Sequence, residues 1–123
     1  MSDALLIVGH GSTSEQAGDV LPYYVELLKK SGEFDEVLAC YLEKEPGVEG
    51  ALGRIKAGRV FVMPLLVAHG YHTKVTIPRA LGIGSAHGLI GDKEVIYLEP
   101  LGRSELIVRL IKERVEGAKS GKL

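Results

Sequence analysis

Four short apolar runs, each followed by a segment with helical or turn character, constrain this chain most strongly. The runs occupy residues 4–8, 36–42, 60–68 and 94–98. Strands that are apolar on both faces and alternate with helices are typical of a parallel sheet covered on both sides. We therefore expect a single α/β domain over residues 1–123, a three-layer αβα sandwich. Its four parallel strands take the flavodoxin-like order 2-1-3-4, because right-handed crossovers leave few alternatives.

The segments between the runs predict short helices. Apolar spacing indicates helices over residues 20–30, 46–55, 76–81 and 104–115. Residues 82–91 contain four glycines and are expected to form a loop, and residues 116–123 are expected to fray. Pro64 lies inside the third run and should disturb strand pairing there.

The histidines follow the first and third apolar runs. His10 comes directly after the first run, between two glycines, and His69 and His72 follow the third. In the order 2-1-3-4 the winding direction reverses between these strands, and ligands bind at such a crevice. Glu43 follows the second run and Glu99 the fourth, so both flank the histidines. His87 falls in the expected loop and should simply be exposed.

Two facing imidazoles with a nearby carboxylate are suited to bind a divalent transition metal. The same imidazoles can also act as general bases near neutral pH. The alternative is that each histidine is an ordinary surface or capping residue. Three cationic residues are expected near the same edge: Lys74, Arg79 and Arg103. They are either ordinary solvated side chains or a binding site for an anionic ligand. No G-x-S-x-G elbow or phosphate-binding loop is present, and Gly9 stands where histidine phosphatases carry arginine.

Composition narrows the classes of partner. The formal net charge of −1 argues against nucleic-acid or membrane binding, and no apolar run approaches a membrane span. Cys40 is the single cysteine and lies in an apolar run, so we expect a buried, inert thiol. A cytoplasmic location is expected because no cationic leader precedes the first run.

Four motifs in order resemble the small archaeal CbiX proteins, which are class II tetrapyrrole chelatases. They are V-G-H-G-S at residues 8–12, P-L-L-V-A-H-G-Y-H at 64–72, T-I-P-R-A-L-G at 76–82 and E-P-L-G at 99–102. The resemblance implies insertion of Co²⁺ into sirohydrochlorin with loss of two protons, in cobalamin synthesis. Close relatives insert Ni²⁺ or Fe²⁺. It implies metal binding by His10 and His72, a catalytic contribution from Glu43, and a homodimer.

The resemblance also implies a tetrapyrrole site and no redox cofactor. The substrate carboxylates should meet backbone N–H groups or cationic side chains. The residues expected there are Gly11, Ser12, Gly70, Tyr71, Lys74 and Arg79. Thr76 stands where many members have aspartate. A non-catalytic carrier of metal or tetrapyrrole, or a plain structural dimer, remains as an alternative.

Overall fold

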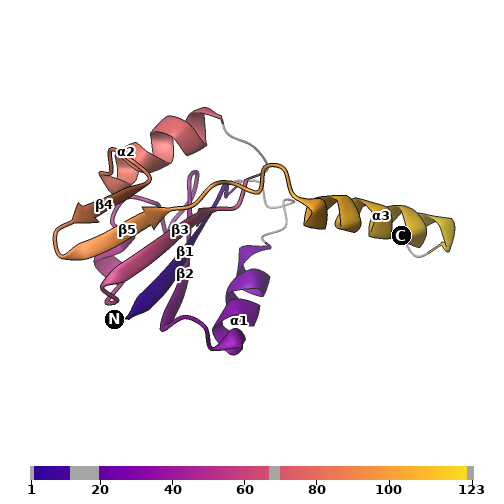
Figure 1. The fold of residues 1–123 in the computed structure, drawn as a ribbon, viewed down its shortest axis with the longest axis horizontal. Helices are drawn as coiled ribbons and strands as arrows, with labels where there is room; N and C mark the ends of the chain where they lie inside the picture. The colour runs from indigo at the N-terminus through magenta and orange to yellow at the C-terminus, as the bar shows by residue number, and fades with distance from the viewer. Residues whose placement is uncertain (1, 12–19, 67–69, 122–123) are drawn as a thin grey trace.

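The computed structural model describes residues 2–11, 20–66 and 70–121. These residues form one five-stranded sheet with helices on either side (Figure 1). The elements in chain order are β1 (Asp3–Gly9), α1 (Leu21–Ser31), β2 (Glu36–Tyr41), the 3₁₀ turn η1 (Leu52–Arg54), β3 (Arg59–Pro64), the π-helical turn η2 (His72–Thr76), α2 (Ile77–Leu81), β4 (His87–Ile90), β5 (Lys93–Tyr97) and α3 (Glu105–Lys119).

The strand order β2-β1-β3-β5-β4 confirms the expected arrangement of the parallel strands. β1 pairs in parallel with both β2 and β3, and Gly9 lies opposite Tyr41 while Val8 lies opposite Pro64. The carboxyl ends of these strands therefore share one edge of the sheet. His10, which follows β1, is at this edge.

The fifth strand, β4, differs from the prediction. Residues 87–90, expected in a loop, pair antiparallel with β5 across a two-residue turn of Gly91 and Asp92. Gly91 takes a φ of 61°, which a tight hairpin favours. β4 was missed because it contains a glycine and an exposed Leu89 and so lacks an apolar run.

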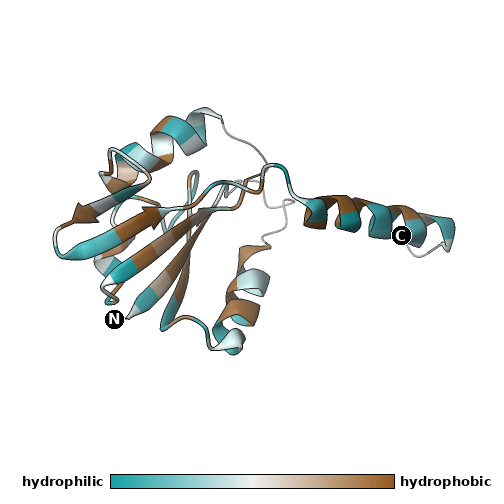
Figure 2. Cartoon of the chain, viewed as in Figure 1, coloured by the Kyte–Doolittle hydropathy of each residue, from teal (hydrophilic) through white to brown (hydrophobic). Residues whose placement is uncertain are grey.

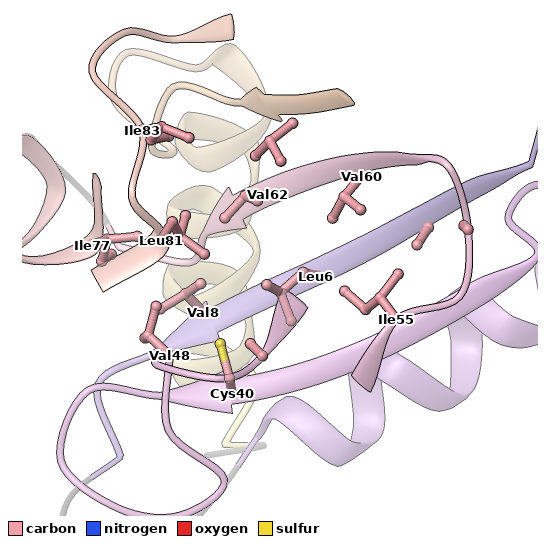
Figure 3. Close-up of a cluster of buried hydrophobic side chains, with 14 residues drawn as sticks. Leu6, Val8, Cys40, Val48, Ile55, Val60, Val62, Ile77, Leu81 and Ile83 are labelled. Carbon is pink, nitrogen blue, oxygen red and sulfur yellow. The ribbon is translucent and has the colours of Figure 1, made fainter. Parts of the chain in front are cut away.

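Successive side chains of β1 point to opposite faces of the sheet, so this strand contributes to the hydrophobic core on both faces. Leu6 and Val8 face one side, where they pack with Val60, Val62 and other buried residues beneath η1 and α2 (Figure 3). Leu5 and Ile7 face the other side and pack with Leu21 of α1. Leu6 is fully buried, and truncating such a side chain to alanine costs about 2–5 kcal/mol of stability.

The expected helix over residues 46–55 is mostly absent. Pro46 begins the segment, glycines interrupt it, and only Leu52–Arg54 forms a 3₁₀ turn. Val48, Ala51 and Ile55 are nevertheless buried in the core, as their spacing indicated. Glycine and proline weakened the helix without changing which side chains face the sheet.

β3 ends at Pro64, whereas the prediction extended the strand to residue 68. Proline cannot donate a ladder hydrogen bond. Leu65 N donates one further bond to Val8 O (2.8 Å), and residues 67–69 lie outside the described part of the chain.

The core also contains Cys40, which is fully buried. Burial raises the pKa of its thiol to about 12, in agreement with the inert thiol that the sequence predicts.

The last helix departs most from the expected sandwich. Ser104 caps α3 by accepting a hydrogen bond from Leu106 N (3.2 Å). The helix continues to Lys119, so residues 116–119, expected to fray, are helical. α3 projects away from the sheet and contains no buried residue (Figure 1). No helix among the described residues is long and apolar enough to cross a membrane.

Candidate metal-binding site

His10 is positioned by the end of β1 and the chain that follows β2. The carbonyl oxygens of Gly9 and His10 accept hydrogen bonds from Leu42 N and Glu43 N, both at 3.0 Å. Gly11 has a φ of 73°, and a Cβ atom there would lie 2.7 Å from Tyr41 Cβ. A side chain at residue 11 would therefore clash with β2, so glycine permits the close approach.

His72 begins η2, the turn that leads into α2. Gly70 N donates to Thr73 Oγ1 (2.8 Å), and Lys74 N donates to Gly70 O (3.0 Å). Tyr97 of β5 donates its hydroxyl to Thr73 O (2.7 Å). Burial, together with the charge of Glu99, raises the pKa of Tyr97 to about 12, so this donor stays protonated at neutral pH. The sheet thereby anchors the turn that bears His72.

The two imidazoles meet across the carboxyl edge, as the sequence predicted. The ring centroids of His10 and His72 are 5.8 Å apart, with an interplanar angle of 72°. Glu43 Oε1 lies 3.4 Å from His10 Nε2, and both side chains are about half exposed. Thr76 Oγ1 lies 3.2 Å from His72 Nδ1. A hydrogen-bond partner at Nδ1 holds the orientation of the imidazole ring.

This arrangement is an open one. Among the described residues no group of three or more His, Cys, Asp and Glu side chains is close enough to hold a metal ion. Structural zinc sites normally close four protein ligands around the ion, whereas sites that exchange or transfer ligands keep positions open. His10, His72 and Glu43 contribute two imidazoles and one carboxylate to this edge of the sheet.

A cavity of about 440 Å³ lies beside Glu43 and Thr76. Its walls come from the chain after β2 and from the turn that leads into α2. The lining residues are Tyr41, Leu42, Glu43, Lys44, Glu45, Gly47, Val48, Glu49, Thr76 and Ala80. Three carboxylates make this wall predominantly acidic, which suits a passing cation better than an anion.

The residues expected to bind substrate are distributed around this site. Lys74 and Arg79 line a second cavity of about 530 Å³, together with Pro78 and Tyr97. Gly70 and Tyr71 immediately precede η2, and Tyr71 is 68% exposed. Gly11 adjoins His10. The positions of Ser12 and His69 lie outside the described residues.

His87 is the first residue of strand β4 and does not lie in a loop, as the sequence analysis expected. Its side chain is 64% exposed, as predicted, and its Nε2 lies 2.6 Å from Glu94 Oε2 on β5. The structure does not bring His87 to the His10–His72 pair.

Two supporting residues were missed by sequence reasoning. Thr76 attracted notice only as a departure from an acidic residue, yet it contacts His72. The four-residue spacing between them is the helical neighbour spacing and could have shown this. Tyr97 gave no comparable signal, because its bond to Thr73 links segments 24 residues apart.

The sequence of residues 4–118 matches the CbiX family. The chain belongs to the CbiX family of chelatases. This match covers nearly the whole chain and confirms the resemblance that the four motifs indicate.

Named relatives of this CbiX chain point the same way. It is 28% identical to the sirohydrochlorin cobaltochelatase of Methanopyrus kandleri, over 94% of this chain and 96% of the relative. It is 37% identical to the probable sirohydrochlorin cobaltochelatase of Halobacterium salinarum, over 90% of this chain but 44% of the relative.

Among solved structures, the sirohydrochlorin chelatase SirB from Bacillus subtilis in complex with cobalt superposes on this CbiX chain with a TM-score of 0.74. The two are 27% identical over 94% of this chain and 50% of SirB. Another SirB structure contains Fe³⁺. The chain thus spans about half the length of SirB and of the Halobacterium relative, but nearly all of the Methanopyrus one.

Proposed function

We propose that this CbiX protein inserts Co²⁺ into sirohydrochlorin. The observation that carries the proposal is the pair of imidazoles, His10 and His72, facing each other 5.8 Å apart at the carboxyl edge of the sheet. In the reaction the ion loses water ligands and binds the four ring nitrogens, while two pyrrole N–H protons leave. Charge balances because a dication replaces two protons.

The imidazoles hold the incoming ion in this mechanism. A neutral imidazole is a good ligand for Co²⁺, Ni²⁺ and Fe²⁺. Two such ligands leave most coordination positions free for water at first and then for the macrocycle. Thr76 fixes the His72 ring through Nδ1 and so keeps Nε2 for the ion.

Glu43 has an assisting role in the proposal. At 3.4 Å from His10 Nε2 it can orient that ring or take up a proton released from the macrocycle. It is half exposed, so the proton can pass from it to solvent. The acidic cavity beside it supports delivery of the cation to this edge.

The propionate and acetate groups of the tetrapyrrole lie at its rim. Gly11, Ser12, Gly70 and Tyr71 bracket the two histidines in sequence and are proposed to meet the ring and its nearer carboxylates. Lys74 and Arg79 line a neighbouring cavity. They are proposed to bind the more distant carboxylates and not the ring centre.

Co²⁺ is proposed as the metal because the Methanopyrus and Halobacterium relatives are named as cobaltochelatases. Insertion of Ni²⁺ or Fe²⁺ is a second possibility that the imidazole pair accommodates, and SirB structures contain cobalt or Fe³⁺. The product would enter cobalamin synthesis with cobalt, or coenzyme F430 synthesis with nickel.

A homodimer is part of the proposal. One copy offers one face of a cleft to a flat macrocycle, and this chain spans half of SirB. A second copy would supply the opposing face.

Anaerobic insertion assays test the proposal. Sirohydrochlorin and its a,c-diamide are each mixed with Co²⁺, Ni²⁺ or Fe²⁺, and the change in the macrocycle's visible spectrum is followed. We expect the wild-type protein to raise the Co²⁺ rate well above the spontaneous rate, and His10→Ala to remove the increase. Tight binding of metal or tetrapyrrole with no increase in rate would instead indicate a carrier.

A further inference from the structure

Tyr97, the last residue of β5, is held firmly by the sheet on both sides. β5 is hydrophilic at its start and becomes apolar towards its carboxyl end (Figure 2). Tyr97 lies opposite Val62 of β3, and its backbone N donates to Ala86 O at 2.7 Å. The Tyr97 side chain therefore extends from a fixed point of the sheet.

This side chain reaches the turn that bears His72. The Tyr97 ring is half-buried and packs against the hydrophobic core beneath α2, and its hydroxyl donates to Thr73 O at 2.7 Å. Thr73 directly follows His72 and is 2% exposed. The Thr73 hydroxyl accepts a hydrogen bond from Gly70 N (2.8 Å) and donates to Gly70 O (3.1 Å). Thr73 is therefore tied both to the sheet and to the chain that enters the turn.

The turn itself is wider than a regular α-helix. Ile77 N donates to His72 O, five residues back, whereas an α-helix joins residues four apart. Pro78 follows and has no backbone N–H with which to continue the helical pattern. Turns of this π-helical kind are rare, short and frequent at functional sites. The orientation of His72 thus depends on an irregular turn, and a hydrogen bond from outside the turn helps to hold it.

A small movement of this turn would separate the two imidazoles. The ring centroids of His10 and His72 are 5.8 Å apart. A nitrogen ligand lies about 2.0–2.1 Å from an ion such as Zn²⁺, so two imidazoles share one ion only when their nitrogens lie within about 4 Å of each other. Binding sites therefore hold their ligands to within about 0.5 Å of the productive geometry.

We propose that Tyr97 is a positioning residue for the His10–His72 pair. By donating to Thr73 O, its hydroxyl keeps the turn, and with it the imidazole of His72, in place to share an ion with His10. This role rests on the proposed function of His72 as a ligand of the ion. It adds a residue that acts on the ion only through the backbone next to that ligand.

A competing role for the same hydroxyl is direct contact with the tetrapyrrole. Tyr97 lines the cavity of about 530 Å³ in which Lys74 and Arg79 are proposed to bind carboxylates. A phenol has a single O–H to donate, however, and that hydrogen is used in the bond to Thr73 O. The hydrogen bond therefore favours positioning of the turn over binding of a substrate carboxylate.

Tyr97→Phe tests the proposal, because it removes the hydroxyl and keeps the ring in the core. We expect Co²⁺ to bind roughly two- to tenfold more weakly, the effect of one lost hydrogen bond. Calorimetric titration with Co²⁺ alone measures this without tetrapyrrole, so the result does not depend on insertion. Co²⁺ affinity equal to that of the wild type would overturn the proposal.

Tyr23→Phe is the matched control. It removes the same atom from a tyrosine of α1 that is 63% exposed, and it should bind Co²⁺ as the wild type does. An equal loss of affinity in both variants would show that the effect is not specific to Tyr97 and would also overturn the proposal.

The visible spectrum of bound Co²⁺ separates positioning from a purely structural role. This absorption reports the arrangement of the ligands around the ion, so at saturating Co²⁺ we expect it to differ between Tyr97→Phe and the wild type. Urea titration gives the free energy of unfolding of the same variant. A less stable variant with the affinity and spectrum of the wild type would show that the hydroxyl serves stability alone.

Insertion kinetics distinguish this proposal from the competing role and from failure of the proposed function. In Tyr97→Phe the KM for Co²⁺ should rise while the KM for sirohydrochlorin stays unchanged. A rise in the KM for sirohydrochlorin alone would assign the hydroxyl to the tetrapyrrole and overturn the positioning role. If the wild type binds Co²⁺ without inserting it, the proposed function fails, whereas the titration and the spectrum still decide the role of Tyr97.

Discussion

Two histidine–glutamate pairs lie among the residues that the structure describes, and the closer pair is not at the candidate site. His87 Nε2 and Glu94 Oε2 are 2.6 Å apart on the β4–β5 hairpin. His10 Nε2 and Glu43 Oε1 are 3.4 Å apart at the carboxyl edge. Distance alone would therefore select the pair that lies away from the candidate site.

The difference lies in what each pair has beside it. His87 and Glu94 are on adjacent strands of one hairpin, seven residues apart in sequence, and hold a single imidazole. His10 and Glu43 follow separate parallel strands and meet a second imidazole, His72, from a third segment. The candidate site is the place where segments distant in sequence meet at one edge of the sheet, and it is not the place of the shortest histidine–glutamate contact.

The largest expected effects come from His10→Ala and His72→Ala. Each removes one of the two imidazoles, so we expect loss of metal insertion to the spontaneous rate and much weaker Co²⁺ binding. Co²⁺ titration and the insertion assay measure this, with circular dichroism to show that the fold persists. Retention of the ion by His72→Ala would assign the second ligand to another residue.

Glu43→Gln should have a smaller effect. The amide cannot accept a proton, but both imidazoles remain. Outer-shell carboxylates of this type typically contribute about 10–100-fold, so we expect turnover to fall by this order while Co²⁺ still binds. Equal turnover in the variant and the wild type would make Glu43 an ordinary solvated carboxylate.

Thr76→Val tests whether the contact to His72 Nδ1 matters. Valine keeps the branched shape and removes one hydrogen bond, which is worth about 0.5–1.5 kcal/mol or roughly a two- to tenfold weaker affinity for Co²⁺. Thr76→Ser retains the hydroxyl and should restore affinity. If serine and valine behave alike, the hydroxyl does not position the ring.

His87→Ala should change insertion least. The pair it breaks is exposed, and such pairs contribute about 0–1 kcal/mol to stability. We expect wild-type turnover and a free energy of unfolding, from urea titration, that is lower by at most this amount. A marked loss of turnover would remove the distinction between the two pairs.

The sequence predicted the sheet well because apolar runs report burial on both faces. The ends of those runs also placed His10, Glu43 and His72 at one edge. β4 carries no such run and was missed, although Gly91-Asp92 is a recognisable hairpin turn.

The direction of α3 shows a second limit of prediction from the sequence. Its periodicity correctly predicted a helix and indicated which side seeks burial. It could not indicate that this side stays exposed, because the helix leaves the sheet after a segment held by the backbone hydrogen bonds of Leu98 and Leu101. Thr76 was undervalued because it was compared only with an acidic residue, whereas its hydroxyl reaches His72 across one helical turn.

The burial of Cys40 determines how this protein reacts with metal ions and thiol reagents in solution. The thiolate is the form of cysteine that alkylates, oxidises readily or captures soft ions such as Cu⁺. The Cys40 thiol is enclosed in the core, with a pKa raised by burial to about 12. Incoming ions therefore do not encounter a thiolate from Cys40. A cysteine introduced on the surface becomes the single reactive thiol of the native chain, which permits site-specific spectroscopic labelling without replacing Cys40.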